Sequence, residues 1–320
     1  MALKRLKKYL RGILIYHRER KQVSIALAEK KEVLMARIVR FVHSIEKGLS
    51  IESPRPEFGY DKIKKMYSWI NEYLDLEDID KTCIYMAADA LADYLKYHET
   101  IGVDTEKIYE IRTIASRLKE IKEEDGVEGV FGGVQTIEKS QMLFDISKIE
   151  QFFTTRHSIR QFKKESVPNE LIEKAIDLAQ TAPSACNRQA VRAYCVEAQR
   201  FIDLYPAKLE GVGGFIESSD KIVLITGKIS SYEYSEHKQF VVSAGIFVGY
   251  LTLALHGIGV GTCVVQRSLV PDNTWHEFCS KTGIPSDEQA VCLLAVGQLD
   301  EKIVVPVSKR FDIKKIFKWL

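Results

Sequence analysis

The stretch 156–189 constrains the fold of this chain more than any other part of the sequence. Residues 171–179 repeat apolar side chains at helical spacing and therefore predict a helix. Pro168 suits the first turn of that helix, because the N–H that proline lacks would have no partner there. Pro183 ends the helix, since proline disfavours helical geometry at the residue before it. The predicted helix thus separates a basic segment from a polar loop.

The two ends of this stretch carry residue types that suit a flat, polar-edged ligand with a phosphate group. Arg156 and Arg160 can form forked, charge-assisted bonds to a phosphate or to a carbonyl edge, and Ser158 adds a hydroxyl donor. The loop after the helix offers hydroxyl and amide groups that can bind a ring edge, from Ser184, Asn187 and Gln189. Taken alone, the basic pattern is typical of a charged turn. The two patterns in succession indicate a ligand site.

The pattern Arg156-His157-Ser158-x-Arg160, followed by Ala-Pro-Ser-x-x-Asn-x-Gln, resembles the nitroreductase family of FMN-dependent oxidoreductases. The resemblance covers about residues 152–320. Further support comes from the glycine-rich segment 257–263, from Ala-Val-Gly at 295–297, and from Pro306 with Arg310. The resemblance implies an α+β fold, with a nitroreductase-like mixed sheet flanked by helices. It also implies an obligate homodimer with FMN at the subunit interface.

The resemblance further implies which residues contact the cofactor. Arg156, Ser158 and Arg310 would bind the FMN phosphate, with His157 in the same motif. Arg160 would lie at the pyrimidine edge of the flavin, where reduction builds up negative charge. The residues implied around the ring are Pro183, Ser184, Asn187 and Gln189, with backbone amides among Val264, Val265, Gln266 and Arg267 on the N5 side. No side chain is needed as a nucleophile or general base, because the flavin carries the hydride.

The function implied is reduction of an electron-poor small molecule by NAD(P)H in a ping-pong reaction. Ala190 and Val191 stand where the family usually has proline and often an aromatic residue, and this departure concerns substrate preference. One alternative is therefore a flavin-dependent dehydrogenase or oxidase that acts on a biosynthetic intermediate. Another is a flavin domain that its N-terminal part docks to a membrane or an assembly.

Composition bears on several classes of function. A net charge of +2 gives no reason to expect a nucleic-acid partner. The six cysteines form no CxxC pair and share no metal-ligand spacing with the seven histidines. We therefore expect reduced thiols, no metal site and a cytoplasmic enzyme. We also expect no membrane-spanning helix, because no apolar run reaches the length needed to cross a bilayer.

The N-terminal half has a different character. Residues 1–21 form a basic amphipathic segment, which suits either an anionic membrane surface or an arm packed on a partner subunit. Helical patterns follow at about 23–47, 61–75, 79–99 and 104–123. We therefore predict a helical N-terminal module over 1–123. A Gly-rich linker would span 124–150, ahead of an FMN-binding domain over 151–320.

The sequence pattern after residues 156–189 predicts alternating strands and helices. Strands are expected at 192–196, 221–226 and 292–296, of which 221–226 is almost continuously apolar, as in a buried sheet. Residues 240–254 are apolar nearly all round, which favours a helix in the core or at an obligate interface. A closing helix is expected at 311–320.

Overall fold

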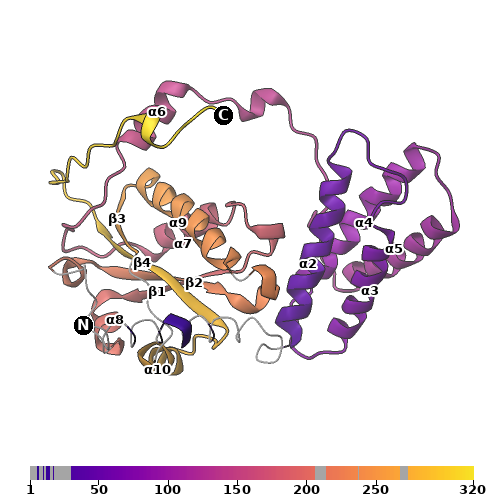
Figure 1. Cartoon of the computed structure of the whole chain (residues 1–320), viewed down its shortest axis with the longest axis horizontal. Helices are drawn as coiled ribbons and strands as arrows, with labels where there is room; N and C mark the ends of the chain where they lie inside the picture. Colours follow the sequence, from indigo (N-terminus) through magenta and orange to yellow (C-terminus); the bar gives the residue numbers. More distant parts are fainter. Residues whose placement is uncertain are drawn as a thin grey trace.

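The computed structural model describes residues 30–205, 214–236, 238–266 and 273–320, together with Leu6, Leu10, residues 12–14 and His17. The basic segment 1–21 lies mostly outside the described residues, so its membrane or partner contact stays a prediction. Figure 1 shows helices α2–α5 gathered at one end of the molecule and the strands in the other part. Helix α2 is the one on the side of the bundle that faces the strands.

The described N-terminal helices lie close to the predicted spans. Their bounds are α2 (Lys30–Leu49), α3 (Tyr60–Leu74), α4 (Thr82–Thr100) and α5 (Glu106–Glu124). Each helix turns an apolar stripe inward, and one hydrophobic cluster drawn from residues 34–121 joins all four. Burial of these stripes is the main source of stability for helices of this length, since isolated short helices are marginal in water.

The Gly-rich segment after α5 begins by running along this helical bundle. Phe131 packs on the bundle core, and its N–H donates to Asp89 Oδ2 at 2.7 Å. The Val134 N–H donates to Asp93 Oδ2 at 2.8 Å. A Cβ on Gly132 would lie 2.4 Å from the Met86 carbonyl oxygen, so only glycine allows this close approach. The domain limits at 123 and 150 stay predictions, and these contacts attach the start of the linker to the helices.

The second part of the chain is built on a four-stranded sheet in the order β1-β2-β4-β3. Its strands are β1 (Val191–Glu197), β2 (Lys221–Lys228), β3 (Val260–Val265) and β4 (Glu288–Gln298). The predicted α+β class is confirmed. Every pairing among the described strands is antiparallel, whereas the resemblance implied a mixed sheet. The reason is topological: β2 and β3 run in the same direction, but β4 lies between them and pairs with both.

Helices cover both faces of this sheet. On one face pack α7 (Asn169–Ala179) and α9 (Gln239–Gly257), and on the other α8 (Ala198–Leu204) and α10 (Asn273–Thr282). Strand β2 sends alternate side chains into the two resulting cores, and all its residues are buried. This two-sided burial explains why its sequence is almost continuously apolar.

The expectation that no apolar run is long enough to cross a membrane is wrong for helix α9. By length and composition alone, α9 is long and apolar enough to cross a membrane. In this fold one face of α9 packs on the sheet through Ala244, Leu251 and Leu255. The opposite face leaves apolar side chains exposed, namely those of Val241, Val242, Ile246 and Tyr250. Helix α9 is therefore a core helix with one uncovered apolar face.

Two predicted helix ends differ from the structure. Pro168 is the N-cap of α7 rather than a first-turn residue, which still leaves its missing N–H without consequence. The closing helix expected at 311–320 is wrong, because only a 3-10 turn forms at Ile313–Lys315. Phe311 and Trp319 are 86% and 85% exposed. An apolar face that packs on nothing in its own chain does not stabilise so short a helix.

Candidate flavin-binding site

One cavity of about 470 Å³ brings the basic motif and the C-terminal segment together. We call it the arginine cavity, and its lining residues are Phe153, Thr154, Arg156, His157, Ser158, Arg160 and residues 306–310. Phe153 and Thr154 belong to α6 (Ile146–Thr154), which Figure 1 shows close to the C-terminal segment. The structure thus gathers five predicted cofactor residues, Arg156, His157, Ser158, Arg160 and Arg310, around one space.

The basic motif reaches this position by lying along the sheet edge. The Ile159 N–H donates to the Thr262 carbonyl oxygen of β3 at 2.8 Å, and the Ile159 side chain is buried. Gly261 permits this approach, since a Cβ there would lie 3.1 Å from the Gly297 carbonyl oxygen and 3.3 Å from Ile159 Cγ2. Gly261, a residue of the glycine-rich segment 257–263, therefore allows the basic motif to pack closely on the sheet.

The arginine cavity is strongly cationic. Within the described residues, Arg156, Arg160 and Arg310 form no ion pair with a carboxylate. Arg310 Nη1 donates to the Ser308 carbonyl oxygen at 3.0 Å, and Arg160 Nη1 lies 3.5 Å from that of Ser158. Cations gathered without counter-charges favour an anionic ligand such as a phosphate.

His256 is a neighbour of this cavity that the sequence reasoning missed. Its Nε2 lies 3.0 Å from Thr155 Oγ1, at the end of α9. Burial lowers the pKa of His256, and the charges of Arg156 and His157 lower it further. The ring therefore tends to stay neutral and leaves the positive charge of the site to the arginines. His256 lies about a hundred residues after the basic motif, so no local sequence pattern connects the two.

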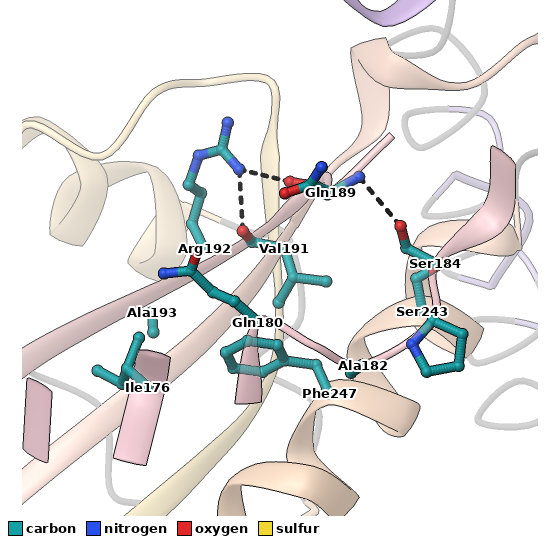
Figure 2. A pocket seen from close by; sticks show the side chains of 11 residues that line it. Ile176, Gln180, Ala182, Ser184, Gln189, Val191, Arg192, Ala193, Ser243 and Phe247 are labelled. Atoms are coloured by element: carbon teal, nitrogen blue, oxygen red, sulfur yellow. Dashed lines mark hydrogen bonds between the residues drawn. The ribbon is translucent and has the colours of Figure 1, made fainter. Parts of the chain in front are cut away.

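A second cavity of about 280 Å³ lies beside the loop that follows α7 (Figure 2). We call it the loop cavity. Of the predicted ring contacts it contains Pro183, Ser184 and Gln189. The sequence reasoning did not assign the other residues of its lining to the site, namely Ile176, Gln180, Ala182, Val191, Arg192, Ala193, Ser243 and Phe247. These residues come from α7 and the chain just after it, from β1 and from α9, so their convergence depends on tertiary packing.

The loop between Pro183 and Gln189 is held in a rare backbone conformation. Cys186, Asn187 and Gln189 have φ values of 54°, 53° and 49°, in the left-handed region that non-glycine residues seldom adopt. Ser184 closes the loop, because its Oγ accepts from the Gln189 N–H at 3.1 Å, a bond drawn in Figure 2. The Ala185 N–H donates to Ser243 Oγ at 3.3 Å. Such strain persists only where surrounding contacts fix the backbone.

The other predicted ring contacts lie outside both cavities. Asn187 is half-buried, and its Oδ1 accepts from Gln189 Nε2 at 3.4 Å. Val264 and Val265 end β3, and Gln266 follows them as an exposed residue. Arg267 lies outside the described residues. The cofactor role of all these residues stays a prediction.

The two cavities lie at opposite edges of the sheet. The arginine cavity adjoins β3 through the Ile159–Thr262 bond, and the loop cavity contains Val191 and Arg192 of β1. Strands β1 and β3 are the two edges of the four-stranded sheet, and the cavities share no lining residue. Three strand spacings separate the edges by about 14 Å. The chain thus presents two halves of the predicted site at different edges of the sheet.

The expected absence of a metal site stays a prediction. Within the described residues, no group of three or more histidine, cysteine or acidic side chains could hold a metal ion. His43 Nδ1 and Glu46 Oε2 are 3.2 Å apart on α2, and no further ligand among the described residues joins them.

Comparison with known proteins gives a family match for the segment that carries the basic motif and the strained loop. Residues 153–222 match the family model described as "Nitroreductase family". This segment is a nitroreductase-family domain. The match includes the basic motif, α7, the strained loop and β1, and it ends at the start of β2. It supports the resemblance that the sequence predicted and gives this part of the chain the fold of a flavin oxidoreductase.

Curated relatives carry a more specific name. Iodotyrosine deiodinase from Haliscomenobacter hydrossis is 24% identical over 211 residues, which cover 57% of this chain and 92% of that protein. Iodotyrosine dehalogenase 1 homolog from Caenorhabditis elegans is 23% identical over 57% of this chain, and the chain spans 62% of that protein.

Solved structures with nitroreductase names are also similar to part of this chain. An FMN-dependent nitroreductase from Clostridium difficile R20291 is 23% identical, with a TM-score of 0.44 over 52% of this chain and 96% of that one. A putative nitroreductase in complex with FMN from Desulfovibrio desulfuricans is 19% identical, with a TM-score of 0.45 over 54% and 96%.

Proposed function

We propose that this protein is an FMN-dependent oxidoreductase that uses NAD(P)H to reduce an electron-poor small molecule by a ping-pong reaction. The arginine cavity is the observation that carries the proposal. Its arginines have no carboxylate partner among the described residues, and its volume of about 470 Å³ accommodates a phosphate with part of a cofactor. The nitroreductase-family segment supplies Arg156, Arg160 and His157 to its lining, and the two arginines are cationic.

The residues of the arginine cavity have separate tasks in this proposal. Arg156, Ser158 and Arg310 hold the phosphate through charged and hydroxyl donors. Arg160 places a positive charge at the ring edge where negative charge develops on reduction. Bound FMN supplies the hydride chemistry. The protein contributes orientation and electrostatics, so we assign no side chain as nucleophile or base.

We also propose that two copies of the chain complete each site. The arginine cavity of one copy would face the loop cavity of the other, because one chain holds them at opposite sheet edges. Apolar surface that a second copy would cover is present on the uncovered face of α9 and on the C-terminal segment. Val307 in that segment is 90% exposed, which is unusual for an apolar side chain next to a cavity.

Complementation between two variants tests this arrangement. One copy carries Arg156→Ala, and the other carries Ser184→Ala with Gln189→Ala, each with a different affinity tag. A heterodimer then has one site with both halves intact, so it should bind FMN at one of its two sites while either variant alone binds poorly. Poor FMN binding by the heterodimer as well would show that each site is built within one chain.

A halogenated aromatic compound is a specific candidate for the acceptor. The curated relatives described above are named as iodotyrosine deiodinase and dehalogenase. In such a reaction two electrons and a proton replace the carbon–iodine bond with carbon–hydrogen and release iodide. The electrons come from the flavin after its reduction by NAD(P)H. A nitroaromatic acceptor is the general alternative for this family.

Anaerobic titration tests the reaction. The purified protein should show the absorption bands of bound flavin, and NADH or NADPH should bleach them. Addition of 3-iodotyrosine should restore the bands with release of iodide if the relatives indicate the acceptor, whereas a nitroaromatic compound should restore them otherwise. A protein that binds no FMN after purification and reconstitution would overturn the proposed function. Flavin that neither nicotinamide reduces would instead favour the dehydrogenase alternative.

A further inference from the structure

Helix α2 joins the helical module to the strained loop of the flavin domain. It packs directly against the 3-10 turn η2 (Ala185–Asn187), which lies inside that loop. It also packs against η4 (Ile229–Ser231), which follows β2. Figure 1 shows α2 as the helix of the module nearest to the strands. The loop therefore has the loop cavity on one side and α2 on another.

An ion pair fixes α2 next to the end of the loop. Glu32 Oε2 of α2 lies 2.6 Å from Lys228 Nζ, whose side chain is only 8% exposed. The backbone N–H of Lys228 donates to the Ala190 carbonyl oxygen at 2.8 Å, one residue after the loop. A single residue of β2 thus contacts both the helix and the chain that leaves the loop.

A second set of contacts holds the loop itself. The Arg188 side chain, only 1% exposed, forms a two-pronged ion pair with Glu236 at 2.8 and 2.9 Å. Arg188 Nη1 also donates to the Ser231 carbonyl oxygen of η4 at 3.0 Å, and its guanidinium lies 4.9 Å from the centre of the Tyr232 ring. Arg188 is therefore an internal anchor of the loop rather than a ligand contact.

Helix α2 contributes charge to the same cluster. Arg40 Nη1 and Arg37 Nε lie 3.5 and 3.9 Å from Glu233 Oε1. The Glu233 N–H in turn donates to the Glu236 carboxylate at 3.1 Å. A small cavity of about 20 Å³ lies between α2, Arg188 and η4. The helix and the anchor are nearly close-packed, so a shift of one must move the other.

We propose that helix α2 is a positioning element for the flavin site, which holds loop 183–189 in its left-handed conformation from behind. The inference rests on the proposed function and gives the N-terminal module a task in it. The three left-handed residues are costly, so the loop needs external contacts to keep this form. The contacts come from Glu32, Arg37 and Arg40 through Lys228, Glu233 and the Arg188 anchor. The contacts across this interface therefore set how tightly the flavin ring is held.

The test is Glu32→Gln in the full-length chain, which removes the charge that faces Lys228 and keeps the size of the side chain. Glu120→Gln is the matched control, because Glu120 is an exposed residue of the same module whose ion pair, with Arg117 at 3.1 Å, lies on its own helix. Dissociation constants for FMN and riboflavin are measured on flavin-free protein, together with the thermal unfolding midpoint. The absorption spectrum is recorded at saturating FMN.

We expect Glu32→Gln to weaken FMN and riboflavin binding by the same factor, about three- to tenfold, because the loop contacts the ring and not the phosphate. The bound-flavin bands at saturation should shift toward those of free FMN, which a merely less stable protein would not show. Glu120→Gln should bind both flavins within about twofold of wild type. The double variant Arg37→Gln/Arg40→Gln should repeat the effect, and it replaces Glu32→Gln if that variant does not fold.

Two results would overturn the positioning role. One is unchanged binding of both flavins by folded Glu32→Gln and by the double variant. The other is weaker binding of FMN with unchanged binding of riboflavin, which would place the effect at the phosphate. Failure of the proposed function has a different signature, because then wild type itself binds neither flavin.

Discussion

The arginine cavity and the loop cavity are built in opposite ways. The arginine cavity is lined by irregular segments, and its cations have few partners inside the described chain. The loop cavity is lined by a segment with hydrogen bonds to Ser184 and Ser243 and with a buried ion pair at Arg188. One region keeps its polar groups free for a ligand, and the other uses them to hold its own backbone.

This difference predicts which property, ligand binding or stability, a mutation in each region should change. Residues of the arginine cavity contribute little to folding, since exposed cations without partners stabilise a fold only weakly. Their loss should appear in ligand binding. Residues behind the loop cavity are buried and paired, so their loss should appear first in stability. The following predictions can break or sharpen that contrast.

The largest effect is expected behind the loop. Arg188→Gln should lower the free energy of unfolding by about 2–4 kcal/mol, because it removes the direct ion-pair partner of Glu236 in a partly buried position. Denaturant unfolding monitored by circular dichroism measures this. Lys174→Gln is the control, since its ion pair with Asp177 is exposed and should change stability by less than about 0.5 kcal/mol. A change of that small size in Arg188→Gln would contradict the contrast.

The same pair predicts a dependence on pH. The hydrogen bonds from Arg188 hold the pKa of Glu236 below its usual value of 4.5. A lowered folded-state pKa means that this stability is present above the unfolded value and is lost as pH falls through the folded value. The stability gap between wild type and Arg188→Gln should therefore be constant near neutral pH and should shrink below about pH 4.5. Unfolding curves at a series of pH values measure it, and a constant gap in acid would contradict this cause.

In the arginine cavity, Arg156→Ala or Arg310→Ala should weaken FMN binding by about 1.5–3 kcal/mol, roughly 10- to 150-fold, through loss of a charge-assisted bond to the phosphate. The unfolding midpoint without flavin should barely change. Riboflavin, which has no phosphate, should bind these variants almost as it binds wild type. Full flavin retention and unchanged FMN affinity in both variants would show that this cavity does not hold the phosphate.

A smaller effect is expected at Arg160. Arg160→Gln keeps a donor of similar reach but removes the charge, so it should lower the two-electron reduction potential of the flavin by roughly 20–45 mV, or about 1–2 kcal/mol. FMN affinity should suffer less than in Arg156→Ala. Spectroelectrochemical titration of both proteins measures the shift. An unchanged potential with FMN fully bound would place Arg160 away from the ring.

No effect on flavin chemistry is expected from deletion of residues 1–21. The segment carries none of the predicted flavin motif, so FMN binding and NAD(P)H oxidation should stay as in the full chain. Flotation with anionic liposomes, with and without the segment, tests its basic amphipathic pattern. Equal flotation of both forms would exclude the membrane role, and weaker FMN binding after deletion would extend the flavin site to this segment.

Much of the fold could be predicted from local sequence patterns. The apolar period of 171–179 predicted α7, and the continuous apolar run at 221–226 predicted the buried strand β2. The closing helix at 311–320 was wrong, although its pattern was apolar, because no described part of the chain covers its apolar side chains. Apolar residues at helical spacing predict a helix only where another element buries the apolar face that they form.

The candidate site was predictable in its residue types but not in its assembly. The sequence by itself determined the basic motif, the polar loop and the glycines that seat the motif on the sheet, because each depends on neighbouring residues or on a fixed pattern. Only the tertiary structure decided that Arg310 meets Arg156 while Gln189 lies at the far sheet edge. It also decided that α2 lies behind the loop. Strand order and helix packing depend on contacts between distant segments, and no local pattern encodes those distances.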